Sequence, residues 1–266
     1  MVDAPTCFIG QTQSGKTFRS CQAFVAHDGP AIFWDVQFRA REFCPEVPRV
    51  RRVGDVVRAL HEWRAPDPPP HLVIELDEYT GLSSLVDYLH GTHLVAHYRG
   101  DSLPKTALFL DEVSMAADRF ADADNPVVKL FTRSYGHNLI GVAITQRPAQ
   151  TSRNVLGNSW EWYVFSPAPA DVLTLERDYR MELPDDGLWV LNPLDHRYFR
   201  FRVGAWFRGD ADGHEVGVDE VSEVQGRDAE IAVRDHEKER QEDVAAQRDS
   251  EVPKVPSTIS AQGEKA

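Results

Sequence analysis

No apolar segment of this 266-residue chain is long enough for a membrane span. A bilayer-crossing helix needs about 18–20 consecutive apolar residues, and no uninterrupted apolar run approaches that length. Residues 1–6 carry no basic flank leading into a long apolar segment, which argues against a signal peptide. We therefore expect a soluble protein without a transmembrane segment that is not exported.

Cysteine is scarce as well. The chain contains Cys7, Cys21 and Cys44, an odd number without Cys-x-x-Cys spacing. This pattern supports neither a disulfide framework nor a zinc site. We expect a reducing compartment, with structural roles for the thiols.

An excess of basic residues is also missing, since the chain has 42 acidic and 29 basic side chains and a formal net charge of −13. Nucleic-acid binding requires Lys and Arg to neutralise phosphates, so the total argues against such a partner. The charge is unevenly distributed, however. Residues 209–266 carry 16 acidic and 7 basic side chains, a net of −9, which leaves −4 for residues 1–208.

The segment 209–266 is predicted to be an acidic tail, separate from a folded domain formed by residues 1–208. No Phe, Trp or Tyr follows Phe207, so the tail cannot bury enough apolar surface to offset its ordering entropy. We expect it to be disordered or partly helical, with at most a solvated helix over about 228–247. It is either a flexible solubilising tail or a docking segment that orders on a partner.

The pattern of residues 1–208 predicts an α/β fold with a mainly parallel central sheet flanked by helices. Apolar runs alternate with segments of helical spacing, and runs that are apolar on both faces are typical of parallel strands covered on both sides. A closing C-terminal β-hairpin is predicted from 188–191 and 198–203. The other predicted strands are 6–9, 31–34, 71–76, 106–110, 139–144 and 162–165, and the predicted helices are 16–26, 53–63 and 82–89.

A phosphate-binding loop is predicted between the first strand and the first helix. The segment fits the pattern GxxxxGK[ST] in full, with the apolar strand before it and the helix after it. Glycines let backbone N–H groups surround phosphate oxygens, and the helix N-terminus adds its positive end. Lys16 would reach the β- and γ-phosphates of ATP, and the Thr17 hydroxyl would bind Mg²⁺. The loop consists of Gly10, Gln11, Thr12, Gln13, Ser14, Gly15, Lys16 and Thr17.

Two further elements complete the predicted catalytic site. The apolar strand 106–110 ends in Asp111 and Glu112, and strand ends are where ligands of open α/β sheets bind. Asp111 would hold Mg²⁺, and Glu112 would accept a proton from the attacking water. The pair at 77–78 has the same form but follows a less apolar strand. The amide of Gln146, at the end of 139–144, can orient water and sense the γ-phosphate.

At these residues the chain resembles the FtsK–HerA superfamily of P-loop ATPases, over roughly residues 5–170. The resemblance implies a RecA/FtsK-like fold, with Gln146 as sensor and an upstream Arg as a finger presented to the neighbouring subunit's nucleotide. That role falls on Arg133, with Arg147 and Arg153 as alternatives. The resemblance is carried by the loop GQTQSGKT, the strand ending in Asp111-Glu112, the stretch 133–148 with its Thr-Gln-Arg-Pro end, and 154–158.

The minimal plan of the chain, without an anchor or an appended DNA-reading domain, looks most like the genome-packaging ATPases of icosahedral, internal-membrane viruses. The resemblance implies a homo-oligomeric ring, expected to be a hexamer, that hydrolyses ATP with Mg²⁺ to pump double-stranded DNA in the host cytoplasm or at the virion. Capsid vertex proteins are further expected partners. The alternatives are a Zot-like phage assembly ATPase and a nucleotide-dependent assembly switch that acts on protein partners.

Three other groups of residues each have a functional and a structural interpretation. Five arginines after the second strand would contact DNA phosphates if they line a pore, or else are surface residues on a solvated loop. Trp160 and Trp162 either stack on bases or pack in the protein. His90, His93 and His97 lack a complementary set of metal ligands, which favours surface or core roles. The five arginines are Arg39, Arg41, Arg49, Arg51 and Arg52.

Overall fold

The computed structural model describes residues 2–64, 67–179, 181, 197–202, 205–210 and 212–217. Within these ranges the strands form one ten-stranded sheet, in the order β10-β9-β8-β7-β1-β6-β5-β2-β4-β3. The strands are β1 (Thr6–Ile9), β2 (Ala31–Asp35), β3 (Arg49–Val50), β4 (His71–Glu75), β5 (Thr106–Leu110), β6 (Leu139–Thr145), β7 (Glu161–Val164), β8 (Tyr198–Arg202), β9 (Ala205–Gly209) and β10 (Glu215–Gly217).

From β7 to β3 neighbouring strands are parallel, whereas β8, β9 and β10 are antiparallel to their neighbours. The sheet is flanked by α1 (Lys16–Val25), α2 (Ala40–Phe43), α3 (Val53–Glu62), α4 (Leu82–Arg99), α5 (Pro126–Arg133), α6 (Arg153–Gly157) and α7 (Pro169–Tyr179). The short 3₁₀ helices are η1 (Val113–Met115), η2 (Tyr135–His137) and η3 (Pro148–Gln150). The predicted fold class, a mainly parallel sheet flanked by helices, is confirmed.

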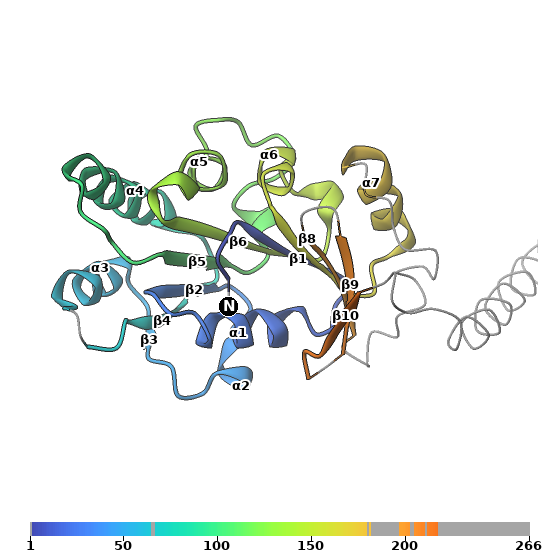
Figure 1. The fold of residues 1–266 in the computed structure, drawn as a ribbon, viewed down its shortest axis with the longest axis horizontal. Helices are drawn as coiled ribbons and strands as arrows, with labels where there is room; N and C mark the ends of the chain where they lie inside the picture. Colours follow the sequence, from blue (N-terminus) through green and yellow to red (C-terminus); the bar gives the residue numbers. More distant parts are fainter. Residues whose placement is uncertain are drawn as a thin grey trace, which may run out of the picture. The chain divides into compact units, whose positions relative to one another are not determined.

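Both faces of the central parallel strands β1, β2, β5 and β6 are buried, and alternate residues of each strand face opposite sides of the sheet. In β1, Cys7 and Ile9 face the larger apolar cluster, which includes side chains of α3 to α7, whereas Phe8 faces the cluster under α1 and α2. Figure 1 shows α4, α5 and α6 on one side of the sheet and α1 and α2 on the other. All three cysteines are buried and free, as the expected structural roles require.

The C-terminal hairpin differs from the prediction in its partner. Strand β8 forms at the expected position, but it pairs with β9 on one side and β7 on the other. The expected partner, 188–191, lies outside the described residues. Arg200 of β8 makes a 2.8 Å ion pair with the buried Glu161 of β7 and a 2.6 Å ion pair with Glu215 of β10. The carboxylates of two strands thus bind one guanidinium and tie the antiparallel strands to the parallel ones.

Strand β10 belongs to the segment that the sequence assigns to the acidic tail, and it pairs with β9 from Glu215 to Gly217. The helix predicted over about 228–247 lies outside the described residues, so it stays a prediction. In the part of the chain that the structure describes, no helix has the length and apolar character needed to cross a bilayer.

Candidate functional site

The predicted phosphate loop joins β1 to α1 at the carboxyl edge of the parallel strands. A Cβ at Gly10 would lie 2.5 Å from the Phe165 carbonyl oxygen and 2.8 Å from Ser14 Oγ, so only glycine fits there. Gly15, at the N-cap of α1, has a φ of 98°, which lies in the left-handed region that favours glycine. The two glycines of the motif therefore fix the path of the loop and the position at which α1 begins.

Lys16 is buried at the start of α1. Its Nζ donates a 2.6 Å hydrogen bond to the Gln11 carbonyl oxygen inside the loop. Burial lowers the pKa of Lys16 to about 8, while the charges of Glu112 and Asp111 act in the opposite direction. The ammonium group is thus held between the loop and the acid pair, where a bound phosphate would meet it.

The acid pair follows β5 directly. Asp111 is only 2% exposed, and within the described residues its buried Oδ2 has no hydrogen-bond partner. Burial raises the pKa of Asp111 to about 7, with further contributions from the charges of Glu112 and Asp35, and Lys16 opposes them. A buried carboxylate oxygen without a partner is costly unless a cation or water meets it. The residues present therefore fit the Mg²⁺ that the motif implies, since carboxylate and hydroxyl oxygens are its ligands.

Glu112, after β5, lies in a chain of side-chain hydrogen bonds that links it to three other segments. Gln146, after β6, donates from Nε2 to Glu112 Oε1 and accepts a 2.6 Å hydrogen bond from Thr12 Oγ1 of the loop. Gln37, after β2, donates from Nε2 to the same Oε1 at 3.0 Å. Gln146 is thus joined both to the loop and to the expected base. The contact with Gln37 was not predicted, because no motif marks that position.

The sheet order explains why the acids at 111–112, rather than those at 77–78, lie at the loop. Strand β5 is two positions from β1, with β6 between them, whereas β4 is four positions away. Asp77 and Glu78 are exposed beyond β4. They follow a strand of similar pattern, but the topology leaves them farther along the sheet edge.

The three candidate arginine fingers lie in different places. Arg133 is exposed at the end of α5, next to Ser134, whose carbonyl accepts from Leu139 N at the start of β6. The phosphate loop lies at the opposite end of the seven-residue β6, a separation of about 20 Å at the rise of a strand. Arg147 is exposed beside Gln146, and Arg153 forms a 3.3 Å ion pair with Asp178. Within the described residues, Arg133 therefore lies far from the nucleotide site of its own chain.

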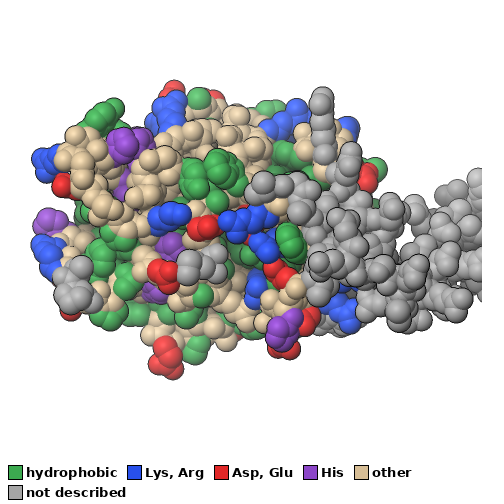
Figure 2. All heavy atoms as spheres, viewed as in Figure 1, with side chains coloured by type: hydrophobic (Ala, Val, Ile, Leu, Met, Phe, Trp, Pro, Cys, Tyr) green, Lys and Arg blue, Asp and Glu red, His purple; other side chains and the backbone are tan. Residues whose placement is uncertain are grey.

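Most of the arginines after β2 have acidic partners. Glu75, 5% exposed at the end of β4, forms ion pairs with Arg41 at 3.0 Å and Arg49 at 3.1 Å. Arg39 lies 3.4 Å from Glu42. The face viewed in Figure 2 likewise carries acidic and basic side chains close together. Three of the five arginines thus already have structural partners, which favours the surface interpretation for them, while Arg51 and Arg52 are exposed.

The tryptophans and histidines take mixed positions. Trp162 is buried and donates from Nε1 to the Ser159 carbonyl at 2.9 Å, whereas Trp160 is 56% exposed and lies 4.7 Å, between ring centroids, from Tyr135. His93 is buried, with Nε2 3.1 Å from Thr106 Oγ1. His90 and His97 instead pack against the ring of His137.

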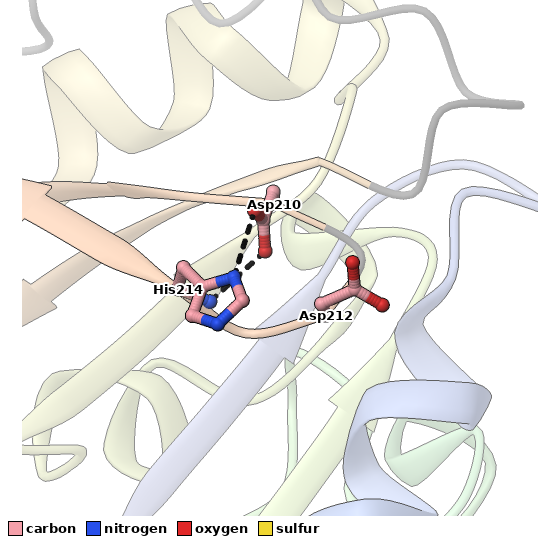
Figure 3. Close-up of side chains that lie close together, drawn as sticks. All are labelled: Asp210, Asp212 and His214. Atoms are coloured by element: carbon pink, nitrogen blue, oxygen red, sulfur yellow. Dashed lines mark hydrogen bonds and ion pairs between the residues drawn. The ribbon is translucent and has the colours of Figure 1, made fainter.

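One group of exposed side chains has the composition of a cation site, in the turn between β9 and β10 (Figure 3). It consists of Asp210, Asp212 and His214. Asp210 Oδ1 accepts from His214 N at 2.9 Å, and Oδ2 lies 3.3 Å from His214 Nδ1. These bonds hold the turn together, which accounts for the closeness of Asp210 and His214 without a metal.

Several solved structures of other proteins have the same fold as this chain. The genome-packaging NTPase B204 of Sulfolobus turreted icosahedral virus 2, solved with sulfate, superimposes with a TM-score of 0.56 at 13% identity, over 82% of this chain and 96% of that chain. Its complex with ATP-γS gives 0.55 at 13% identity, over 81% and 96%. ATPases 2 and 3 of EssC from Geobacillus thermodenitrificans give 0.57 at 11% identity, over 97% of this chain and 48% of that chain.

This chain has a P-loop NTPase fold. The fold-level resemblance expected from the motifs is therefore confirmed. No model of a known protein family matches the sequence, and no curated protein matches it either. The assignment of individual site residues stays a prediction that rests on their motifs and on the geometry above.

Proposed function

We propose that this chain is an ATPase of the FtsK–HerA type that translocates double-stranded DNA, as a viral genome-packaging ATPase working in a homo-oligomeric ring. The observation that carries the proposal is the meeting of the phosphate loop, the acid pair and Gln146 at one edge of the sheet. The hydrogen bonds Thr12–Gln146–Glu112 join all three. The likeness to packaging NTPases and the order of the motifs support the choice among P-loop ATPases.

In the proposed reaction the loop amides and Lys16 bind the phosphates of ATP. The Lys16 ammonium then donates to phosphate oxygens in place of the Gln11 carbonyl oxygen. Thr17 and Asp111 would hold Mg²⁺, which would supply positive charge to the bound phosphates. Glu112 accepts the proton of the attacking water, and Gln146 orients that water and reports whether the γ-phosphate is present.

The finger of the neighbouring subunit is the remaining component, and we assign it to Arg133. Its position at the opposite end of β6 from the loop separates it from its own nucleotide site, which is compatible with a role at the nucleotide of another subunit. Arg133→Ala subunits mixed with Glu112→Gln subunits should recover some ATPase activity at mixed interfaces. Absence of recovery at every ratio would reject Arg133 and leave Arg147 and Arg153 to be tested in the same way.

The deciding measurement is ATP turnover with and without double-stranded DNA over a salt series. A DNA motor should be stimulated by DNA, and the stimulation should weaken as salt rises because phosphate contacts release counterions. Lys16→Ala and Glu112→Gln should lower turnover by orders of magnitude to a small residual rate, and parental rates in these variants would reject the catalytic assignment. ATP turnover that does not respond to DNA at any salt concentration would favour an assembly switch acting on protein partners.

A further inference from the structure

Gln37 is a second amide on the expected catalytic base, and it comes from an element that carries no nucleotide-binding motif. It lies in the short connection between β2 and α2. Its Nε2 donates to Glu112 Oε1 at 3.0 Å, across a sequence separation of 75 residues. The contact exists only because β2 and β5 are neighbours in the sheet.

A buried carboxylate fixes the backbone that carries Gln37. Asp35, at the end of β2, is fully buried, and its two oxygens accept hydrogen bonds from Arg39 N at 3.1 Å and Ala40 N at 2.7 Å. These bonds close the connection into a tight turn in which Phe38 has a φ of 57°. Gln37 is exposed, yet it projects from a backbone that the core holds in place.

Both amide donors meet Glu112 at the same atom. In the part of the chain that the structure describes, the hydrogen bonds of this carboxylate, from Gln37 and from Gln146, are both made to Oε1. Oε2 is thereby left to accept a proton. Glu112 itself has a left-handed backbone, with a φ of 49° and a ψ of 51°, which sets the direction of its side chain.

The two amides differ in what else they bind. Gln146 also accepts from Thr12 in the phosphate loop, so its position depends on the loop and on what the loop holds. Gln37 follows β2, which lies on the other side of β5 from β6 in the sheet order. Its position therefore does not come from the loop or from β6. A carboxylate held by one donor can rotate about its terminal bond, whereas a second donor from another direction restricts that rotation.

We propose that Gln37 is a positioning residue that holds Glu112 with Oε2 directed at the attacking water, including when Gln146 turns to the nucleotide. This inference rests on the proposed ATPase function and names a further residue of its site. Gln37 is not assigned a contact with substrate, and it acts through Glu112.

The test compares Gln37→Met, which keeps the side-chain length but removes the donor, with Gln150→Met. Gln150 is an exposed glutamine in η3, also beyond the carboxyl end of β6, and it has no part in the proposed site. Losing a hydrogen bond to a charged group should lower kcat about tenfold or more in Gln37→Met. The Kd for a fluorescent ATP analogue and the melting temperature should stay at the parental values, as should all three quantities in Gln150→Met.

A double variant separates positioning from other roles. If Gln37 acts through Glu112, adding Gln37→Met to Glu112→Gln should lower the residual rate no further. A further loss in the double variant, a parental kcat in Gln37→Met, or an increased kcat would each overturn the inference. Gln37→Ala provides a second variant with the same expectations. The failure of the proposed function is distinguishable, because it would appear as parental turnover in Glu112→Gln itself.

Discussion

The burial of Asp111 predicts that the metal-free protein becomes less stable as the pH rises, and that Asp111→Asn removes this dependence. The pKa of Asp111 is raised from 3.8 to about 7, first by burial and then by the charges of Glu112 and Asp35. Between these two values the unfolded chain has released the proton and the folded chain keeps it. The unfolded state therefore binds fewer protons, and stability falls as pH rises through this window.

The magnitude follows from the difference between the two pKa values. Each pH unit corresponds to about 1.4 kcal/mol, so the free energy of unfolding should fall by about 4 kcal/mol between pH 4 and pH 7 through this residue alone. Asp111 is 2% exposed, so solvent screening reduces this figure little. Asn keeps the shape and cannot ionise, so Asp111→Asn should gain stability relative to the parent by that amount as the pH rises.

The assay is urea unfolding of both proteins between pH 4.5 and 8, with a chelator and without nucleotide. Comparing the two proteins cancels the contributions of other titrating groups. Asp77→Asn is the matched control, since Asp77 is an exposed acid after β4, and it should follow the parental curve. Parallel curves for the parent and Asp111→Asn over the whole range would refute the reasoning, because burial would then not favour the protonated carboxyl.

The remaining predictions concern stability and can be checked by chemical denaturation. Arg200→Met should destabilise by about 3 kcal/mol, because the buried carboxylate of Glu161 loses its 2.8 Å guanidinium partner and keeps the more distant Arg202 at 3.8 Å; a loss below 1 kcal/mol would contradict this. Asn125→Ala should cost about 1 kcal/mol, since the Asn125 side chain accepts from two backbone amides at the start of α5, and an unchanged midpoint would refute it. Gly141→Ala should cost about 1–3 kcal/mol, because the new Cβ would lie 2.6 Å from the Phe131 ring; a neutral effect would show that the ring moves freely.

Much of the fold was predictable because its strands are local and strongly apolar. The six predicted parallel strands formed within a residue or two of their expected bounds, and the phosphate loop joins β1 and α1 as the motif requires. Helix α5 was not predicted. Its eight residues have buried side chains at Val127, Val128, Leu130 and Phe131, a stretch too short to stand out as a period.

The candidate site was likewise predictable from the sequence in part only. The Gly and Lys positions of the loop could be predicted from the sequence, because phosphate binding dictates their spacing within one segment. The choice of Asp111 over Asp77 required an argument about hydrophobicity in the sequence, whereas the sheet order decides which strand lies nearer the loop. The partners of Arg41 and Arg49 at Glu75 were not readable, since they depend on the pairing of β3 with β4.

The sequence by itself determined the phosphate loop, the alternation of buried strands with helices, and the concentration of negative charge after residue 208. Each of these depends on residues close together in the chain, where spacing and composition set the physics. Only the tertiary structure decided that Gln37 meets Glu112, that Asp111 is buried beside Asp35, and that Arg133 lies at the far end of β6 from the loop. These relations follow from the order of strands in the sheet, which long-range packing selects and no local pattern encodes.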